Sequence, residues 1–258
     1  MRLLLIRHGD PDYEHDTLTQ RGILEAEALA AAAPSMELGD CYVSPLGRAQ
    51  KTASYCLKAV GKTAGTLDWL QEFPARIVVH DDDAELVEAF PDAQQLDGKR
   101  RRHIVWDMMP SYYTSHPETL DPVRWRESRI ARDSDMLPVY DGIISAFDEF
   151  LAGYGYVREN GIYRVERENT QTVTFFCHFG ITAALLSRLW NVSPFVPMQS
   201  IVCAPTSVTE VYTEERTKGI AQFRAVRIGD ISHLTMAGLK PSFSARFCEV
   251  FSDTSARH

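Results

Sequence analysis

The apolar run at residues 3–6, followed directly by Arg7, His8 and Gly9, most constrains what this chain can fold into. A short uncharged run that ends in polar residues is expected where a buried parallel strand delivers side chains to the edge of an open α/β sheet. A binding site would then lie at the carboxyl end of this strand. Alone, an Arg-His-Gly tripeptide is weak evidence, and the alternative is a strand end whose histidine merely forms a hydrogen bond.

The rest of the chain shows an alternation of strand and helix patterns that is typical of an α/β fold. A helix is expected over residues 20–33, with Thr19 as its N-cap and Pro34 as its end. A second helix is expected over residues 45–60, with Ser44 as its N-cap. Further strands are expected at residues 40–43, 66–70, 172–177, 207–212 and 223–228, further helices at 141–151 and 181–190, and a hairpin turn at 159–161.

The length of 258 residues fits one domain with an insertion. The net charge of -8 argues against nucleic-acid binding, although a local basic pocket for an anion is compatible with it. No apolar run is long enough for a secretory signal or a membrane span, so a cytoplasmic location without membrane association is expected. The tail from Ser252 is expected to fray. Reduced thiols are expected for the five cysteines, which include no Cys-x-x-Cys pair: Cys41, Cys56, Cys177, Cys203 and Cys248.

Between residues 74 and 138 the regular periodicity is lost, and we expect an inserted, partly helical lid there. His80 and the three aspartates after it could suggest a metal site, but consecutive residues cannot all converge on one ion, so a solvated acidic face is favoured. The basic run at residues 99–102 is expected to be a solvated helix face. The lid's other notable side chains could contact a substrate or form a small core of the lid: Trp106, Tyr112, Tyr113, Arg124, Trp125 and Arg126.

Five side chains are expected at strand ends or at a helix start, where open α/β sheets bind ligands: Arg7, His8, Arg48, Glu72 and His178. A neutral imidazole is a competent nucleophile toward phosphorus. Guanidinium groups grip phosphate oxygens through paired hydrogen bonds, and a second histidine can assist them. A carboxylic acid beside a phosphate dianion has a raised pKa and can protonate a leaving alkoxide. This chemistry requires neither a metal ion nor another cofactor.

Four motifs in this order resemble those of the histidine phosphatase superfamily, also called the phosphoglycerate mutase-like family: Arg7-His8-Gly9, Ser44-Pro45-Leu46-Gly47-Arg48-Ala49, Leu70-Gln71-Glu72 and Cys177-His178-Phe179-Gly180. The resemblance implies a three-layer α/β/α sandwich with a mostly parallel central sheet. It also implies that His8 is the phosphorylated nucleophile, that Arg7, Arg48 and His178 bind the phosphate, and that Glu72 is the proton donor.

The sequence departs from the commonest family pattern at two positions. Phe179 stands where the family usually has glycine, and Asp10 stands where glutamate or glutamine is usual. Neither change removes a catalytic group, but both bear on substrate choice. Asp10, Asp82 and Glu85 also compete with Glu72 for the role of proton donor. The absence of a His-Asp pair at residues 178–179 favours the cytoplasmic branch over the acid phosphatase and phytase branch.

A metal-independent phosphomonoester hydrolase acting on a small phosphorylated metabolite is the favoured function. A mutase of the phosphoglycerate type would use the same chemistry, but the lid lacks arginine-rich stretches like those of the glycolytic mutases. A non-catalytic phosphate-binding module is a third possibility, against which the complete set of five groups argues. The sequence gives no indication of the oligomeric state.

Overall fold

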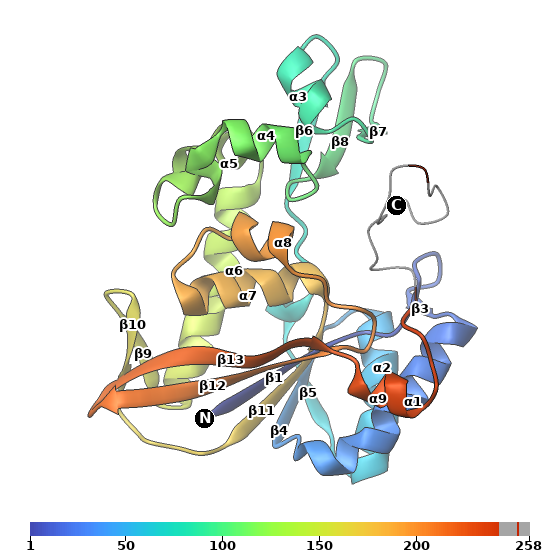
Figure 1. The fold of residues 1–258 in the computed structure, drawn as a ribbon, viewed down its shortest axis with the longest axis vertical. Helices are drawn as coiled ribbons and strands as arrows, with labels where there is room; N and C mark the ends of the chain where they lie inside the picture. The colour runs from blue at the N-terminus through green and yellow to red at the C-terminus, as the bar shows by residue number, and fades with distance from the viewer. Residues whose placement is uncertain (243–251, 253–258) are drawn as a thin grey trace. The chain divides into compact units, whose positions relative to one another are not determined.

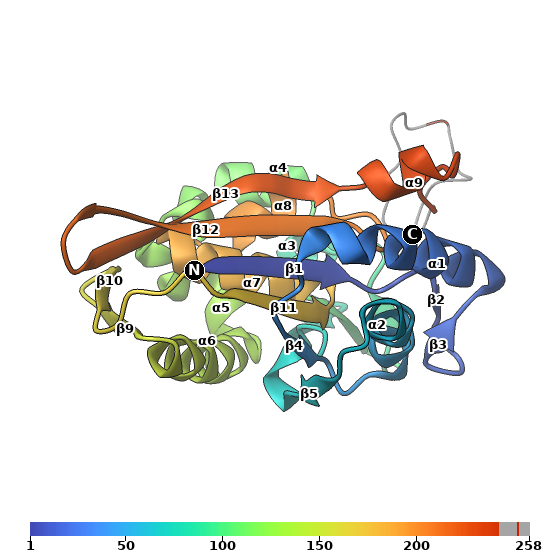
Figure 2. The same cartoon turned by 90° about the horizontal axis from the view of Figure 1, so that it is seen from below.

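The computed structural model describes residues 1–242 and 252, which form two compact units drawn in Figures 1 and 2. The first unit consists of Met1–Glu72, Leu151–Thr182 and Ile201–His258, and the second of Phe73–Phe150 and Ala183–Ser200. Helices α6 (Met136–Gly153) and α7 (Phe179–Trp190) run across this division of the chain. The second unit therefore combines the stretch that begins at Phe73 with a separate segment, Ala183–Ser200, that comes later in the chain.

An eight-stranded sheet with the order β5-β4-β11-β1-β12-β13-β10-β9 forms the first unit. Its strands are β1 (Arg2–Arg7), β4 (Asp40–Val43), β5 (Ala64–Thr66), β9 (Tyr156–Glu159), β10 (Ile162–Val165), β11 (Thr172–Cys177), β12 (Val208–Thr217) and β13 (Ile220–Asp230). The first four strands in the sheet order are parallel, and the others pair antiparallel. Figure 2 shows β1 between β11 and β12. The predicted α/β fold is confirmed, and the Arg-His-Gly motif lies at the end of β1, which has the parallel β11 on one side and the antiparallel β12 on the other.

The apolar run of β1 is buried on both faces of the sheet, since residues 3–6 are at most 2% exposed. Leu4 and Ile6 share an apolar cluster with Leu29 of α1 (Gln20–Met36) and Ala53 of α2 (Gly47–Val60). These two helices therefore cover one face of the parallel half. A short hairpin of β2 (Pro11–Asp12) and β3 (Thr17–Leu18) follows β1, and α9 (Ser232–Met236) follows β13.

Several boundaries differ from the sequence-based expectation. Thr19 caps α1 as predicted, accepting a hydrogen bond from the Gly22 N–H, but Pro34 lies inside this helix. The predicted N-cap at Ser44 is wrong, because α2 begins at Gly47 and the Ser44 hydroxyl bonds a histidine instead. The strand predicted at residues 66–70 is misplaced: β5 covers Ala64–Thr66, and a 3-10 turn, η1 (Asp68–Leu70), follows it.

The second unit contains a small antiparallel sheet with the order β6-β8-β7. Its elements are β6 (Arg76–His80), α3 (Ala84–Ala89), β7 (Gln94–Gln95), β8 (Arg100–Ile104), α4 (Pro110–Ser115), η2 (Pro117–Leu120), η3 (Arg124–Glu127), α5 (Arg129–Arg132) and α8 (Phe195–Ser200). The basic run at residues 99–102 enters strand β8, so the expectation of a helix face is wrong. β8 pairs antiparallel with β6 and with β7, so its successive side chains alternate between the two faces of a sheet.

Aromatic residues of the inserted stretch form packing contacts within the second unit. Trp125 is 3% exposed, and its ring meets those of Tyr140 (5.1 Å) and Phe195 (6.1 Å) edge to face. Arg126 lies over the Trp125 ring and pairs with the Asp141 carboxylate. The Trp125 side chain thus belongs to the core of this unit, and Asp141 engages the Arg126 charge.

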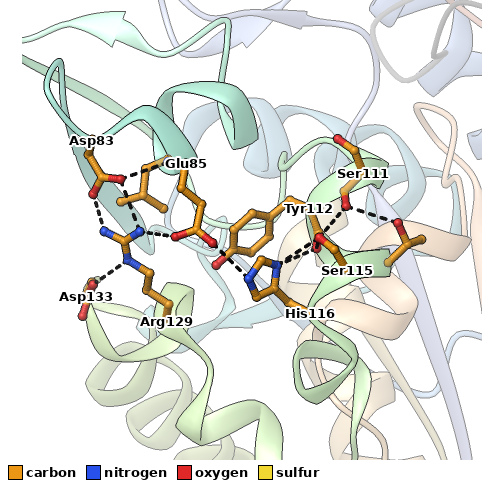
Figure 3. A network of polar contacts seen from close by, with 10 residues as sticks. Asp83, Glu85, Ser111, Tyr112, Ser115, His116, Arg129 and Asp133 are labelled. Atoms are coloured by element: carbon orange, nitrogen blue, oxygen red, sulfur yellow. Dashed lines mark hydrogen bonds and ion pairs between the residues drawn. The ribbon is translucent and has the colours of Figure 1, made fainter.

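A polar network ties together the helices of the second unit (Figure 3). Arg129 of α5 contacts the carboxylates of Asp83, Glu85 and Asp133. Glu85 also lies 3.0 Å from the Nε2 of His116, whose ring stacks on Tyr112. The network connects the start of α3 with α5 and with the end of α4. Its carboxylates therefore serve contacts within this unit.

Four cysteines, Cys41, Cys56, Cys177 and Cys203, are free and buried, as expected for reduced thiols. Cys248 lies outside the described residues, as does the predicted frayed tail except for Ser252. Within residues 1–242 and 252, no helix is both long enough and apolar enough to cross a bilayer.

Candidate active site

His8 follows the last residue of β1, at the carboxyl end of the parallel strands. Its backbone N–H donates to the Cys177 carbonyl oxygen (3.0 Å), which continues the pairing of β1 with β11. The side chain is 1% exposed, and its Nδ1 lies 2.7 Å from the Gly9 carbonyl oxygen. A carbonyl oxygen only accepts hydrogen bonds, so the proton of the neutral ring is assigned to Nδ1. Nε2 then carries the lone pair.

The surroundings of His8 hold its imidazole in the neutral form. Burial lowers the His8 pKa well below its usual range, and the Arg7 charge and the His178 ring add to this effect. Arg48 acts in the same direction, whereas the Gly9 carbonyl opposes it. The ring is therefore neutral at pH 7 and its Nε2 is a nucleophilic nitrogen.

Arg48 is the second residue of α2 and is 8% exposed. Its Nε donates toward the His8 Nε2 over 3.4 Å, in agreement with the lone pair assigned to that atom. Its Nη1 donates to the Asp16 carboxylate at 2.7 Å, and the other Asp16 oxygen accepts the Gly47 N–H at 2.6 Å. Gly47 permits this close approach, because a Cβ there would lie 2.1 Å from the Asp16 carbonyl oxygen. The carboxylate thus fixes both the helix start and the guanidinium.

Arg7 is the last residue of β1 and is 7% exposed. Its Nη1 donates to the Cys203 carbonyl oxygen at 2.5 Å. The segment after Cys203 also contacts His8, because the Thr206 N–H donates to the His8 carbonyl oxygen at 3.0 Å. The loop before β12 therefore anchors Arg7 and His8 together.

His178 follows β11 and is fully buried, with its ring centroid 5.0 Å from that of His8. Its Nε2 lies 2.7 Å from the Ser44 Oγ, whereas its buried Nδ1 has no hydrogen-bond partner in the described structure. Burial, with the charges of Arg48 and Arg7, lowers the pKa of His178 to about 2. His178 is thus a second neutral imidazole beside the first.

Glu72 lies two residues after η1, so its position comes from a 3-10 turn and not from a strand end. Its Oε1 accepts the Gly180 N–H at 2.8 Å, which attaches the carboxyl group to the first turn of α7, two residues after His178. Phe179, which starts α7, is half-buried. The structure therefore brings Glu72 to the segment that carries the second histidine.

The three carboxylates that compete with Glu72 for the role of proton donor make other contacts or belong to the second unit. Asp10 accepts the Thr19 hydroxyl at 2.7 Å, beside the cap of α1, and its backbone N–H donates to Glu25. Asp82 and Glu85 belong to the second unit, where Glu85 contacts Arg129 and His116. Within the first unit, Asp10 thus remains the alternative to Glu72 as the proton donor, and an experiment has to distinguish the two.

Two supporting contacts were not predicted from the sequence. Asp16 accepts a hydrogen bond from Arg48. The sequence did not single out Asp16, because the loop around it contains several acidic residues. Thr206 adopts a left-handed backbone (φ 60°), and its hydroxyl lies 2.9 Å from the His233 Nε2. The contact with His233 of α9 holds this strained conformation beside the His8 carbonyl, so the C-terminal part of the unit supports the position of His8.

The buried neutral histidines predict an acid-sensitive fold. Below pH 6.5 the unfolded chain binds protons that His8, His178 and His233 do not bind when folded; burial also lowers the pKa of His233, to about 4. Each such group is expected to reduce the free energy of unfolding by about 2 kcal/mol between pH 7 and pH 5. The buried Glu25, whose pKa is raised, opposes part of this loss.

Urea denaturation at pH 7, 6 and 5 measures this effect. The urea midpoint is expected to fall steadily with pH in the native protein. A His8→Gln variant, which lacks one of the three groups, should lose less stability over the same range. A free energy of unfolding that stays constant from pH 7 to pH 5 would contradict the assignment of neutral buried rings.

The family comparison agrees with the motifs at these positions. The model for the histidine phosphatase superfamily (branch 1) matches residues 3–115, a stretch that contains Arg7, His8, Arg48 and Glu72. The first part of the chain is thus similar to the histidine phosphatase superfamily. No curated protein sequence matches it.

Solved structures with the same fold cover nearly the whole chain. A phosphoserine phosphatase mutant from Entamoeba histolytica, in complex with phosphoserine, has a TM-score of 0.57 at 16% identity and covers 90% of this chain and 98% of its own. A mycobacterial glucosyl-3-phosphoglycerate phosphatase with inorganic phosphate has a TM-score of 0.54 at 18% identity, with the same coverage of 90% and 98%. At these identities the likeness establishes the fold.

Proposed function

We propose that the protein hydrolyses phosphomonoesters through a phosphohistidine at His8, without a metal ion. The observation that carries this proposal is the His8 imidazole, whose unprotonated Nε2 faces the Arg48 guanidinium while Gly9 holds the proton on Nδ1. Arg7 and Arg48 supply the positive charge, and the neutral His178 adds a hydrogen-bond donor for the phosphoryl oxygens. The match of residues 3–115 to the histidine phosphatase model supports the same reaction class.

In the first step, the His8 Nε2 lone pair attacks phosphorus and the bond from phosphorus to the ester oxygen breaks. The electrons of that bond go to the leaving oxygen, which takes a proton from the Glu72 carboxyl group. In the second step, water attacks the phosphohistidine and gives a proton to the Glu72 carboxylate. The bond from nitrogen to phosphorus breaks, inorganic phosphate leaves, and the Nε2 lone pair is restored.

We propose a small phosphorylated metabolite as the substrate. Two solved structures of the fold are those of phosphoserine phosphatases in complex with phosphoserine and with 3-phosphoglyceric acid. The experiment is phosphate release in EDTA from an aryl phosphate and from a panel that includes phosphoserine, 3-phosphoglycerate and glucosyl-3-phosphoglycerate. Turnover in EDTA is the expected result. Isomerisation of 3-phosphoglycerate without hydrolysis would indicate a mutase, and inactivity across the panel would indicate a binding module.

Glu72→Gln tests the proton donor, because glutamine can still accept the Gly180 N–H but cannot donate an acidic proton. Hydrolysis of an alkyl phosphate, whose leaving group needs a proton, is expected to slow by about 10²- to 10³-fold. The kcat/KM for 4-nitrophenyl phosphate, which reports transfer of the phosphoryl group to His8 and not the later attack of water, should fall by less than about tenfold, because this leaving group is stable as an anion.

Asp10→Asn is the matched comparison for Glu72→Gln. It should show no dependence on the leaving group, since Asp10 contacts the cap of α1. If Asp10→Asn instead shows the larger loss with the alkyl substrate, the acid is Asp10 and the assignment of Glu72 is wrong.

A further inference from the structure

Ser44 is fully buried between β4 and α2, and its hydroxyl does not cap the helix. The Ser44 Oγ accepts the Leu46 N–H at 3.2 Å and lies 2.7 Å from the His178 Nε2. A hydroxyl has a single proton to donate. In the described structure the His178 Nε2 is the acceptor within reach of the Ser44 hydroxyl, so the proton points to that nitrogen.

The other nitrogen of His178 has the complementary property. Because Nε2 accepts from Ser44, the proton of the neutral ring must lie on Nδ1. Nδ1 is buried and has no hydrogen-bond partner in the described structure. An unpaired buried N–H costs free energy, which an oxyanion placed beside it recovers.

We infer that Ser44 is a positioning residue that holds His178 in the Nδ1–H tautomer, so that this N–H donates to a phosphoryl oxygen. The inference rests on the proposed function for its catalytic meaning, although the tautomer itself is a property of the resting protein. With the opposite tautomer, the Nδ1 lone pair would face the phosphoryl oxygens and repel them. Because the pKa of His178 is low, the ring stays neutral and carries one proton, so the choice of nitrogen matters.

The tautomer can be read directly from the ¹⁵N chemical shifts of the His178 ring in protein labelled at histidine. The native protein should show a protonated Nδ1 and an unprotonated Nε2. In Ser44→Ala, which removes the hydroxyl that lies against Nε2 in the described structure, the proton is expected to shift to Nε2 for a substantial fraction of molecules. A native ring protonated at Nε2 would overturn the inference whether or not the protein turns over any substrate.

Kinetics and phosphate binding supply the second measurement. Ser44→Ala is expected to lower kcat/KM for 4-nitrophenyl phosphate by about 10- to 100-fold and to weaken binding of inorganic phosphate. Ser44→Thr, which keeps a hydroxyl, should restore the Nδ1–H tautomer and most of the rate. In a His178→Ala background, adding Ser44→Ala should have little further effect, because the two residues act as a unit.

Ser54→Ala serves as the matched control, since its exposed hydroxyl bonds the Lys51 carbonyl oxygen on the same helix. It should leave the tautomer and the rate unchanged. Native kinetics in Ser44→Ala, or a full additional loss in the His178→Ala background, would overturn the inference. A native protein with no turnover at all would instead reject the proposed function, and the ¹⁵N shifts and phosphate binding would still decide the role of Ser44.

Discussion

His8→Ala is expected to lower kcat for 4-nitrophenyl phosphate by at least about 10⁴-fold, because it removes the imidazole on which we propose the covalent intermediate forms. The His8 Nε2 is the unprotonated nitrogen that faces Arg48, and alanine removes it together with the contact to Gly9. Phosphate release in EDTA, followed under saturating substrate, measures the loss.

The control for His8→Ala is His80→Ala, which removes an exposed histidine at the end of β6. It should keep the native rate. Circular dichroism of both variants separates loss of the nucleophile from loss of the fold. Residual activity above about one per cent in a folded His8→Ala protein would mean that the phosphoryl group is attacked by something other than this imidazole.

Arg48→Ala is expected to lower kcat/KM by about 10³-fold. Its guanidinium is held by Asp16 with Nε toward the nucleophile, so the group is oriented before substrate arrives. The variant loses charge-assisted hydrogen bonds to the phosphoryl oxygens, which strengthen as charge shifts in the transition state. Steady-state kinetics and inhibition by inorganic phosphate measure the two effects separately.

Arg48→Lys and Lys51→Ala provide the comparison for charge alone. Lysine keeps a positive charge but not the planar fork, so it should recover only a small part of the rate. Lys51→Ala removes a positive charge from the exposed side of the same helix, three residues further on, and should have little effect. Equal losses in Arg48→Ala and Lys51→Ala would show that net charge, and not the Arg48 contacts, binds the phosphate.

The positions of Arg7, His8 and His178 could be predicted because each follows an apolar run with the pattern of a buried strand. The carboxyl ends of parallel strands meet at one edge, and β1 and β11 are neighbours in the sheet. Arg48 was expected in the first turn of a helix because Ser44 and Pro45 resemble a cap and a first helical residue, and it does lie in the first turn, although α2 begins at Gly47. In these cases local pattern and overall topology agree.

The supporting contacts could not be predicted in the same way. Ser44 has the residue type and spacing of an N-cap, but its hydroxyl bonds His178, which is 134 residues away in the chain. Asp16 is one acidic residue among several in its loop. Its contact with the Gly47 N–H is seen only in the folded structure. Long-range pairing overrides local propensity at both positions.

The predictions for the inserted stretch depended on weaker patterns. Residues 99–102 carry only charged side chains, which have no apolar periodicity, and the strand they enter is defined by pairing with β6 and β7. The second unit also takes in Ala183–Ser200, a segment that no local feature of residues 74–138 could indicate. Contacts between distant parts of a chain are not encoded in short windows.

Labelling of the covalent intermediate tests the central claim most directly. The native protein is mixed with ³²P-labelled substrate, quenched in alkali within the first turnovers, and digested for peptide mapping. We predict an acid-labile, alkali-stable label on the peptide that contains His8, present in Glu72→Gln and absent from His8→Ala. Native protein that turns over the substrate yet carries no label at any quench time, or carries it on another residue, would contradict the account.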